Sequence, residues 1–164
     1  MQQSEFKIII TQYKDLNELP ENDRLLILAA REIARSAYAP YSGFRVGAAL
    51  RMSDGCIITG NNQENASSPV GCCAERTALY WANANFPEKP VLALAITAID
   101  RAGNLAAHLS PCGTCRQALL ETEIRFNQPI RVLLDSRNQI DALNNVKSLL
   151  PLSFNEDSVS VAVQ

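Results

Sequence analysis

Apolar side chains recur at helical spacing from Asn22 onward, which predicts an amphipathic helix that ends before Pro40. Two more helices are expected over residues 72–85 and 112–124. Continuous apolar runs predict buried strands over 91–99 and 130–134, and a hairpin is expected where strands 45–52 and 56–59 flank Ser53-Asp54-Gly55. A short strand or helix is expected before residues 149–151, and a short strand or frayed helix over 6–10.

A hairpin followed by alternating helices and strands indicates an α/β fold in which a mixed sheet lies between helical layers. Crossovers between parallel strands should be right-handed. We find no internal repeat, low-complexity segment or shift in composition. The chain is therefore expected to form one domain over 1–164, with residues 1–20 as a loosely attached N-terminal extension that Pro20 closes.

Composition narrows the classes of partner. Of the 164 residues 47% are hydrophobic and 20% charged, as in a globular protein, and the net charge is -2 with a pI of about 5.4. Such a surface argues against nucleic acid and anionic membranes as partners and favours a substrate without phosphate. Because no apolar run reaches the roughly 18 residues of a membrane span and the N-terminus is unlike a signal peptide, we expect a cytoplasmic protein.

The chain has five cysteines, an odd number that favours metal binding or catalysis over a disulfide framework. The decisive pattern is Cys73-Ala74-Glu75, followed after residues 76–110 by Pro111-Cys112-Gly113-Thr114-Cys115. Each half alone is ambiguous, because a Cys-x-x-Cys pair also occurs in redox and structural sites. Together the two halves predict a zinc site with three thiolates: Cys73, Cys112 and Cys115.

The fourth zinc position decides between a structural and a catalytic site, because a catalytic zinc keeps that position for water. His108 or Cys72 would close the site if either were a ligand, and both alternatives stay open. Adjacent residues of a helical turn point in different directions, so we expect Cys72 to be a small core residue. Cys56 is expected to be a strand residue.

The predicted ligands lie near the starts of two helices, where the positive helix end favours the thiolate. Glu75 is the candidate proton carrier beside a metal-activated water. Arg76 is expected to donate to a ligand sulfur and offset the negative charge of three thiolates. The alternatives without a catalytic role are that Glu75 is a glutamate on the helix surface and that Arg76 forms a surface ion pair.

These motifs resemble the zinc deaminases, and within them the small homotetrameric cytidine deaminases. The resemblance runs from about Ile33 to Asp157. It is carried by residues 39–50, by the Asn62-Gln63-Glu64-Asn65-Ala66 loop, by 73–78 and 110–117, and by the C-terminal block of 149–151 with Phe154. It departs from the family at Gly43, Gln63, Ser68 and Cys72.

The resemblance implies a three-layer α/β/α sandwich with a five-stranded mixed sheet, one zinc ion per subunit and a role in pyrimidine salvage. The implied reaction is hydrolytic deamination of cytidine and deoxycytidine, in which Glu75 carries protons to N3 and to the departing amino group. The resemblance also implies the substrate contacts. Phe44 would pack on the pyrimidine, and Asn62 and Glu64 would bind the ribose 3′-hydroxyl. The Ala74 N–H would donate to the 2-carbonyl, the Pro111 carbonyl would accept from the 4-amino group, and Phe154 would enter the pocket of a neighbouring subunit.

Two alternatives remain at this stage. Blasticidin-type and nucleotide deaminases share the zinc core, but the 62–66 loop and the C-terminal block favour a free nucleoside, and no cluster of basic residues suggests a phosphorylated substrate. A non-catalytic zinc-binding or nucleic-acid-binding module would need a closed site, with His108 as the fourth ligand. The acidic pI argues against nucleic acid.

Overall fold

The centre of the computed structural model, which describes residues 2–155 and 158, is one six-stranded sheet with the order β1-β6-β5-β4-β2-β3. β4 and β5 pair in parallel, and every other neighbouring pair is antiparallel. The strands are β1 (Thr11–Tyr13), β2 (Arg45–Met52), β3 (Ile57–Asn61), β4 (Val91–Ile99), β5 (Arg131–Asp135) and β6 (Ile140–Leu143).

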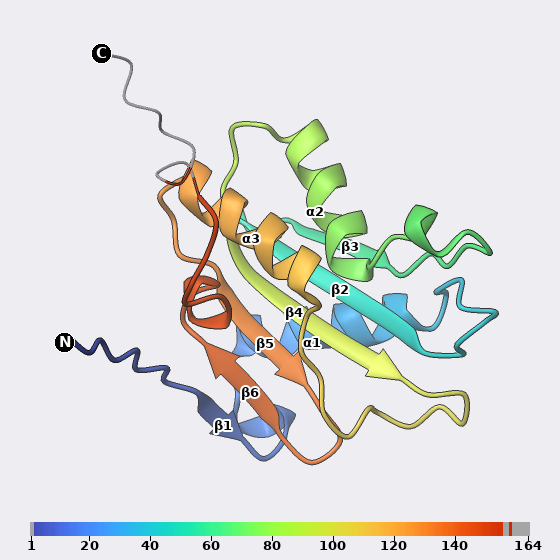
Figure 1. Cartoon of the computed structure of the whole chain (residues 1–164). Helices are drawn as coiled ribbons and strands as arrows, with labels where there is room; N and C mark the ends of the chain where they lie inside the picture. The colour runs from blue at the N-terminus through green and yellow to red at the C-terminus, as the bar shows by residue number, and fades with distance from the viewer. Residues whose placement is uncertain (1, 156–157, 159–164) are drawn as a thin grey trace.

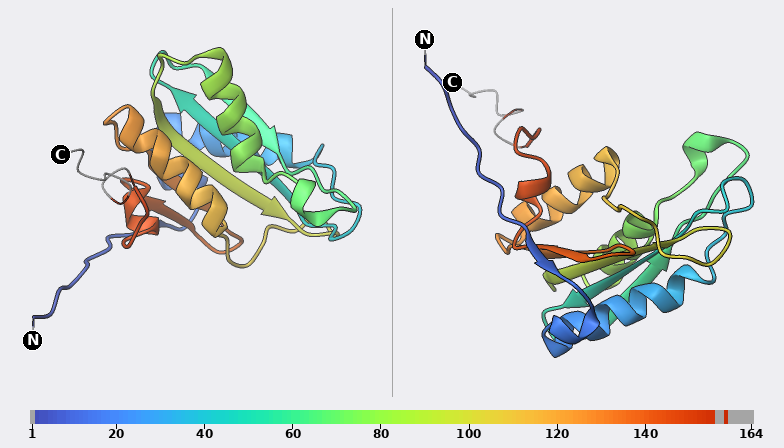
Figure 2. Two further views of the ribbon diagram at one scale, coloured as in Figure 1. Left: turned by 45° about the horizontal axis from the view of Figure 1, so that its top comes forward. Right: turned by 90° about the horizontal axis from the view of Figure 1, so that it is seen from below.

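Helices cover both faces of this sheet (Figure 1). The helix α1 (Glu21–Ala34) packs on one face, while α2 (Ala74–Asn85) and α3 (Gly113–Arg125) lie side by side on the other, as the two views of Figure 2 also show. Each face has its own apolar core. The expected α/β/α layering of a mixed sheet is therefore confirmed.

The sheet has six strands where five were expected. The additional strand is β1, which pairs with β6 in the register Thr11↔Ala142 to Tyr13↔Ile140. The predicted strand or frayed helix over 6–10 is wrong, because those residues carry no regular structure and lie exposed before β1. The short 3-10 helices are Leu16–Glu18, Ser68–Val70 and Lys147–Leu149.

The position of β4 in the sheet explains why the apolar run over 91–99 predicts a buried strand. Leu94 and Ile96 belong to the core under α2 and α3, whereas Ala93 and Ala95 belong to the core under α1. A strand that is buried on both faces needs apolar residues at every position rather than alternation. The bounds predicted for β2 and β4 are those observed.

The segment after α1 shapes one wall of the site. α1 ends at Ala34, and residue Tyr38 then forms a bridge with Gln63. The Tyr38 N–H donates to the Asn62 carbonyl at 3.1 Å, and the Glu64 N–H donates to the Tyr38 carbonyl at 2.8 Å. These bonds hold residues 39–44 beside the 62–66 loop.

No helix among the described residues is long and apolar enough to cross a membrane. The C-terminal limit of the family resemblance, Asp157, lies outside the described residues.

Candidate metal centre and active site

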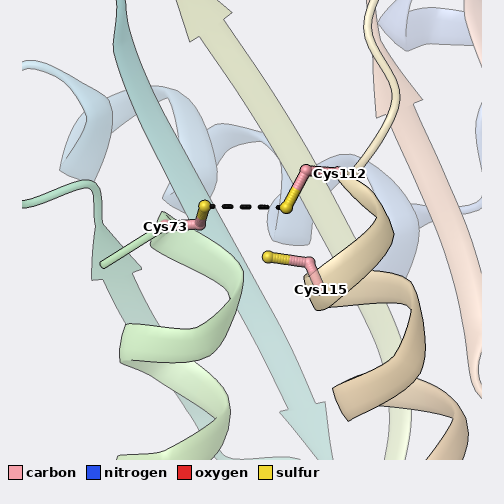
Figure 3. Close-up of side chains that lie close together, drawn as sticks. All are labelled: Cys73, Cys112 and Cys115. Carbon is pink, nitrogen blue, oxygen red and sulfur yellow. Dashed lines mark hydrogen bonds between the residues drawn. The ribbon is translucent and has the colours of Figure 1, made fainter. Parts of the chain in front are cut away.

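Three cysteine sulfurs meet between the starts of α2 and α3 (Figure 3). Cys73 caps the N-terminus of α2, Cys112 caps α3, and Cys115 lies in the first turn of α3. The three sulfurs lie within 4.8 Å of one another, and the Cys73 and Cys112 sulfurs are 3.8 Å apart. The sequence motif therefore folds into one cluster.

This cluster fits a tetrahedral zinc ion. With a Zn–S distance of about 2.3 Å, two ligand sulfurs lie about 3.8 Å apart along the edge of a tetrahedron. That separation is the one observed between Cys73 and Cys112. The donor set consists of three sulfurs, the soft ligands that zinc accepts, and both helices direct their positive ends at it.

The thiols differ in acidity. A hydrogen bond from Cys115, together with the hydrogen bonds of Arg76 and Cys112, lowers the pKa of Cys73 to about 5 against the opposing effect of burial. The same hydrogen bond, burial and the nearby Glu75 raise the pKa of Cys115. Cys73 is thus the more acidic of these two thiols, and metal binding must displace the proton of Cys115.

The fourth position of this group has no protein ligand among the residues described. Neither His108 nor Cys72 belongs to the cluster, and His108 is exposed. Cys72 is half-buried and lines the adjacent cavity, so its assignment to the core is wrong. Cys56 is exposed and lies one residue before β3, so the prediction that it is a strand residue is also wrong.

Glu75 occupies the first turn of α2 and is only 5% exposed. Burial raises its pKa first of all, and the Cys73 thiolate raises it further. A carboxyl group in this environment takes up a proton more readily than an ordinary glutamate. The residue predicted as the proton carrier is therefore a buried acid beside the sulfur cluster.

Arg76 points toward the same cluster. Its Nη2 donates to the Cys73 sulfur at 3.9 Å, and this hydrogen bond raises the pKa of the guanidinium. Its Nε is buried with no hydrogen-bond partner in the described part of the chain. A positive group at this place offsets thiolate charge, as the sequence predicted.

A cavity of about 520 Å³ opens beside the sulfurs, and its polar wall includes the residues predicted to hold a sugar. The Glu64 carboxylate accepts hydrogen bonds from the Tyr41 and Ser42 N–H groups, at 2.9 Å and 3.2 Å, and from the Ser42 hydroxyl. These contacts lower the pKa of Glu64, the Ser42 hydroxyl most of all. The cavity is lined by Tyr41, Asn62, Gln63, Glu64, Asn65, Ala66, Ser68, Gly71, Cys72, Cys73 and Arg76.

Asn62 holds the start of β2 against this wall. Its side-chain oxygen accepts from the Val46 N–H at 2.7 Å, and its amide nitrogen donates to the Phe44 carbonyl at 3.0 Å. Phe44 itself is 40% exposed and is not among the described residues that line the cavity. Asn62 thus positions the segment that carries Phe44.

The remaining predicted residues fall into two groups. Ala74 and Pro111 are buried next to ligand cysteines, at the starts of the two helices. Phe154 is 62% exposed and does not line the cavity of its own chain, while its carbonyl accepts from the Gln117 side chain at 2.8 Å.

Sequence reasoning overlooked Arg116, which directly follows a ligand cysteine. Its guanidinium donates to the Pro111 carbonyl at 2.9 Å, to the Leu149 carbonyl at 2.9 Å and to the Ser110 hydroxyl at 2.8 Å. Arg116 therefore ties the loop before α3 to the C-terminal block. Its place next to Cys115 was the only signal in the sequence.

Comparison with known proteins agrees with this geometry. Residues 20–127 match the model of the cytidine and deoxycytidylate deaminase zinc-binding region. A cytidine deaminase of Halalkalibacterium halodurans is 44% identical over 98 residues, covering 60% of this chain and 70% of the relative. A cytidine deaminase of Sporosarcina psychrophila is 37% identical over 139 residues, covering 85% and 96% of the two chains.

Solved structures give the same result. The crystal structure of cytidine deaminase from Burkholderia pseudomallei superposes with a TM-score of 0.66 at 36% identity, covering 79% of this chain and 97% of that one. The enzyme from Mycobacterium tuberculosis gives 0.61 at 34% identity, covering 80% and 95%. With its three-cysteine centre and buried Glu75, the chain belongs to the zinc-dependent cytidine and deoxycytidylate deaminase family.

Proposed function

We propose that this protein hydrolyses cytidine and deoxycytidine to uridine and deoxyuridine with release of ammonia, as a step of pyrimidine salvage. One observation carries the proposal: three sulfurs leave a fourth metal position without a protein ligand, and the buried carboxyl of Glu75 lies beside them. A structural zinc site would be closed by a fourth side chain. The alternative of a non-catalytic zinc module is therefore disfavoured.

In the proposed reaction, Cys73, Cys112 and Cys115 would hold zinc, whose chemistry when bound would be that of a Lewis acid that activates water at neutral pH. Glu75 accepts the proton of that water and delivers it to N3 of cytosine, which makes C4 more electrophilic. Once the water oxygen has bonded to C4, Glu75 would take the second proton of that oxygen and pass it to the amino group, so that the C4–N bond breaks and ammonia leaves. The raised pKa of Glu75 suits a group that must both accept and release a proton near neutral pH.

The base would be oriented by backbone groups at the two helix starts. Ala74 is the first residue of α2, where N–H groups have no partner within the helix, so its N–H can donate to the 2-carbonyl. The Pro111 carbonyl would accept from the 4-amino group. One of its lone pairs is already used by Arg116, which leaves the other for the substrate.

The sugar would lie against the wall formed by Asn62 and Glu64, with Phe44 against the pyrimidine ring. A carboxylate offers about four lone-pair sites, and Glu64 uses three of them for Tyr41 and Ser42. One site therefore remains for the ribose 3′-hydroxyl. Asn62 likewise keeps one amide hydrogen beyond its bond to Phe44.

The cavity favours a nucleoside without phosphate. Among the described residues that line it, the only cation is Arg76, and this guanidinium is directed at the Cys73 sulfur. A 5′-phosphate would find no free basic partner on that wall. The lining of the cavity therefore favours a nucleoside over a nucleotide as the substrate.

Two features at the scale of the assembly complete the proposal. The family resemblance implies a homotetramer, and the exposed ring of Phe154 would be free to enter a neighbouring pocket in it. The protein would act in the cytoplasm on small molecules, without a nucleic-acid or membrane partner, as its acidic pI suggests.

A steady-state comparison on one purified sample tests the function. We expect ammonia release from cytidine and deoxycytidine, far slower turnover of cytidine monophosphate and blasticidin S, and close to one zinc per chain by atomic emission. Deamination of the monophosphate or of blasticidin S in preference to the nucleosides would replace the proposed substrate. A sample that carries zinc but deaminates none of them would support the non-catalytic module.

A further inference from the structure

The loop between β4 and α3 sends Arg101 across the position of Gly43. A Cβ atom added to Gly43 would lie 2.2 Å from Arg101 Cγ and 2.1 Å from its Nε. Such distances are far inside van der Waals contact, so residue 43 must lack a side chain for Arg101 to lie there. Gly43 also has φ +69, which L side chains seldom adopt.

From this position Arg101 reaches the turn that holds Glu64. Its Nη2 donates to the Tyr41 carbonyl at 2.8 Å. The N–H groups of Tyr41 and Ser42 are the ones that bind the Glu64 carboxylate. Arg101 and Glu64 therefore bind the same turn. Arg101 contacts the Tyr41 carbonyl, and Glu64 contacts the N–H groups of Tyr41 and Ser42.

The charge of Arg101 also helps to keep Glu64 in the form that accepts hydrogen bonds. The positive charge of Arg101 contributes to lowering the pKa of Glu64, after the larger effects of Ser42 and Tyr41. A cation near the carboxylate keeps it ionised and available as an acceptor. Without Arg101 the turn would keep the bond from the Gly43 N–H to the Ala39 carbonyl, but the Tyr41 carbonyl would lose the Arg101 contact, and the carboxylate would be held less firmly at the cavity.

We propose that Arg101, in the space left by Gly43, is a positioning residue that fixes the 41–42 turn and thereby holds Glu64 ready for a sugar hydroxyl. This inference rests on the proposed function, in which Glu64 receives the ribose 3′-hydroxyl. It assigns to the β4–α3 loop a role in substrate specificity, separate from its role in leading to Cys112.

The test compares cytidine with 3′-deoxycytidine, which has the same base and lacks only the 3′-hydroxyl. Loss of one hydrogen-bonded contact corresponds to a change of about threefold to tenfold. We expect Arg101→Ala to raise KM for cytidine by that factor, to leave kcat within about twofold, and to leave KM for 3′-deoxycytidine unchanged. Arg101→Lys, which keeps the charge and one donor, should recover part of the loss.

Arg137→Ala is the matched control. Arg137 is also an exposed arginine near this loop, and it donates to the Leu105 carbonyl at 3.1 Å rather than to Tyr41. We expect it to leave the preference between the two substrates unchanged. If Arg101→Ala lowers kcat/KM equally for both substrates, or for neither, Arg101 is not a positioning residue for the sugar contact.

Gly43→Asn provides an independent check, because asparagine tolerates a positive φ but its Cβ would displace Arg101. The variant should reproduce the Arg101→Ala phenotype, and the double variant should be no worse than either single one. Additive losses would mean that the two residues act separately.

Glu64→Ala separates this inference from the proposed function on which it rests. If Glu64→Ala abolishes the preference for cytidine while Arg101→Ala retains it, only the role of Arg101 fails. If Glu64→Ala retains the full preference, the proposed sugar contact fails and the role of Arg101 fails with it. Zinc content and thermal unfolding of every variant identify any general loss of fold.

Discussion

At the residue scale, the proposed chemistry depends on two side chains of the first turn of α2, a buried carboxyl and a guanidinium that contacts a ligand sulfur. Glu75 is buried with a raised pKa, while Arg76 places its guanidinium on the Cys73 sulfur. Both residues belong to the local motif Cys-Ala-Glu-Arg, so both were predictable from the sequence. Their roles are still separable by substitution.

Replacement of Glu75 by glutamine should leave the zinc site intact and remove the proton carrier. We expect close to one zinc per chain and a loss of about 10²- to 10⁴-fold in kcat for cytidine, the range attributed to a general acid–base group. Ammonia release and atomic emission measure the two quantities. Glu121→Gln, on the exposed side of α3, is the control and should keep ordinary turnover. Ordinary turnover by the Glu75→Gln variant would contradict the proposed role of Glu75 as the proton carrier.

The lowered pKa of Cys73 predicts a pH dependence in the metal-free protein. A thiol with a pKa of about 5 is a thiolate at neutral pH and loses this form as the pH falls through 5. Alkylation of Cys73 by iodoacetamide should therefore be nearly constant from about pH 8 to pH 6 and fall below that. Mass spectrometry at each pH gives the rate. A rate that still rises about tenfold per pH unit between pH 6 and pH 8 would contradict the assignment.

At the scale of elements, a glycine of the sheet lies at a close backbone approach to α2 and another at a close approach to α1. A Cβ at Gly60 in β3 would lie 2.5 Å from the Ala78 nitrogen of α2, and one at Gly47 in β2 would lie 2.1 Å from the Ala30 carbonyl of α1. Both neighbours are backbone atoms of helices, which cannot turn aside as a side chain can. The two glycines therefore set how closely α2 and α1 approach.

Gly60→Ala and Gly47→Ala should thus differ in function while sharing a loss of stability. We expect each to lower the free energy of unfolding by about 1–3 kcal/mol through overpacking. Only Gly60→Ala should also weaken zinc binding, because α2 starts at the ligand Cys73. Urea unfolding and competition with a chelator measure the two effects. A weaker metal site in Gly47→Ala alone would show that α2 is not positioned through Gly60.

The elements also show where prediction from sequence succeeds. β4 was predictable because a strand covered on both faces is apolar at almost every position. The ligand cysteines were predictable because Cys73 lies in one local motif and Cys112 and Cys115 lie in another. β1 was not, since the polar segment Thr11–Tyr13 becomes a strand only by pairing with the distant β6. Arg101 and Arg116 were missed for the same reason, because each acts on a carbonyl that folding brings close.

At the scale of the whole molecule, the C-terminal block contributes no residue to the lining of the cavity in the described part of the chain. Arg116 and Gln117 of α3 hold that block by the carbonyls of Leu149 and Phe154. The Phe154 ring nevertheless points to a position where it is 62% exposed and outside the cavity lining. An exposed aromatic ring on a backbone that Gln117 anchors is available to enter another subunit.

Hybrid assemblies would show whose pocket Phe154 completes. Phe154→Ala subunits retain Glu75 but lack the aromatic ring, and Glu75→Gln subunits retain the ring but lack the proton carrier. If the ring acts in a neighbouring pocket, co-expression of the two variants should form sites with both groups, and kcat/KM for cytidine should exceed the sum of the separately purified variants. If Phe154 served its own pocket, every hybrid site would lack one group, and the mixture would show only the average of the two parents.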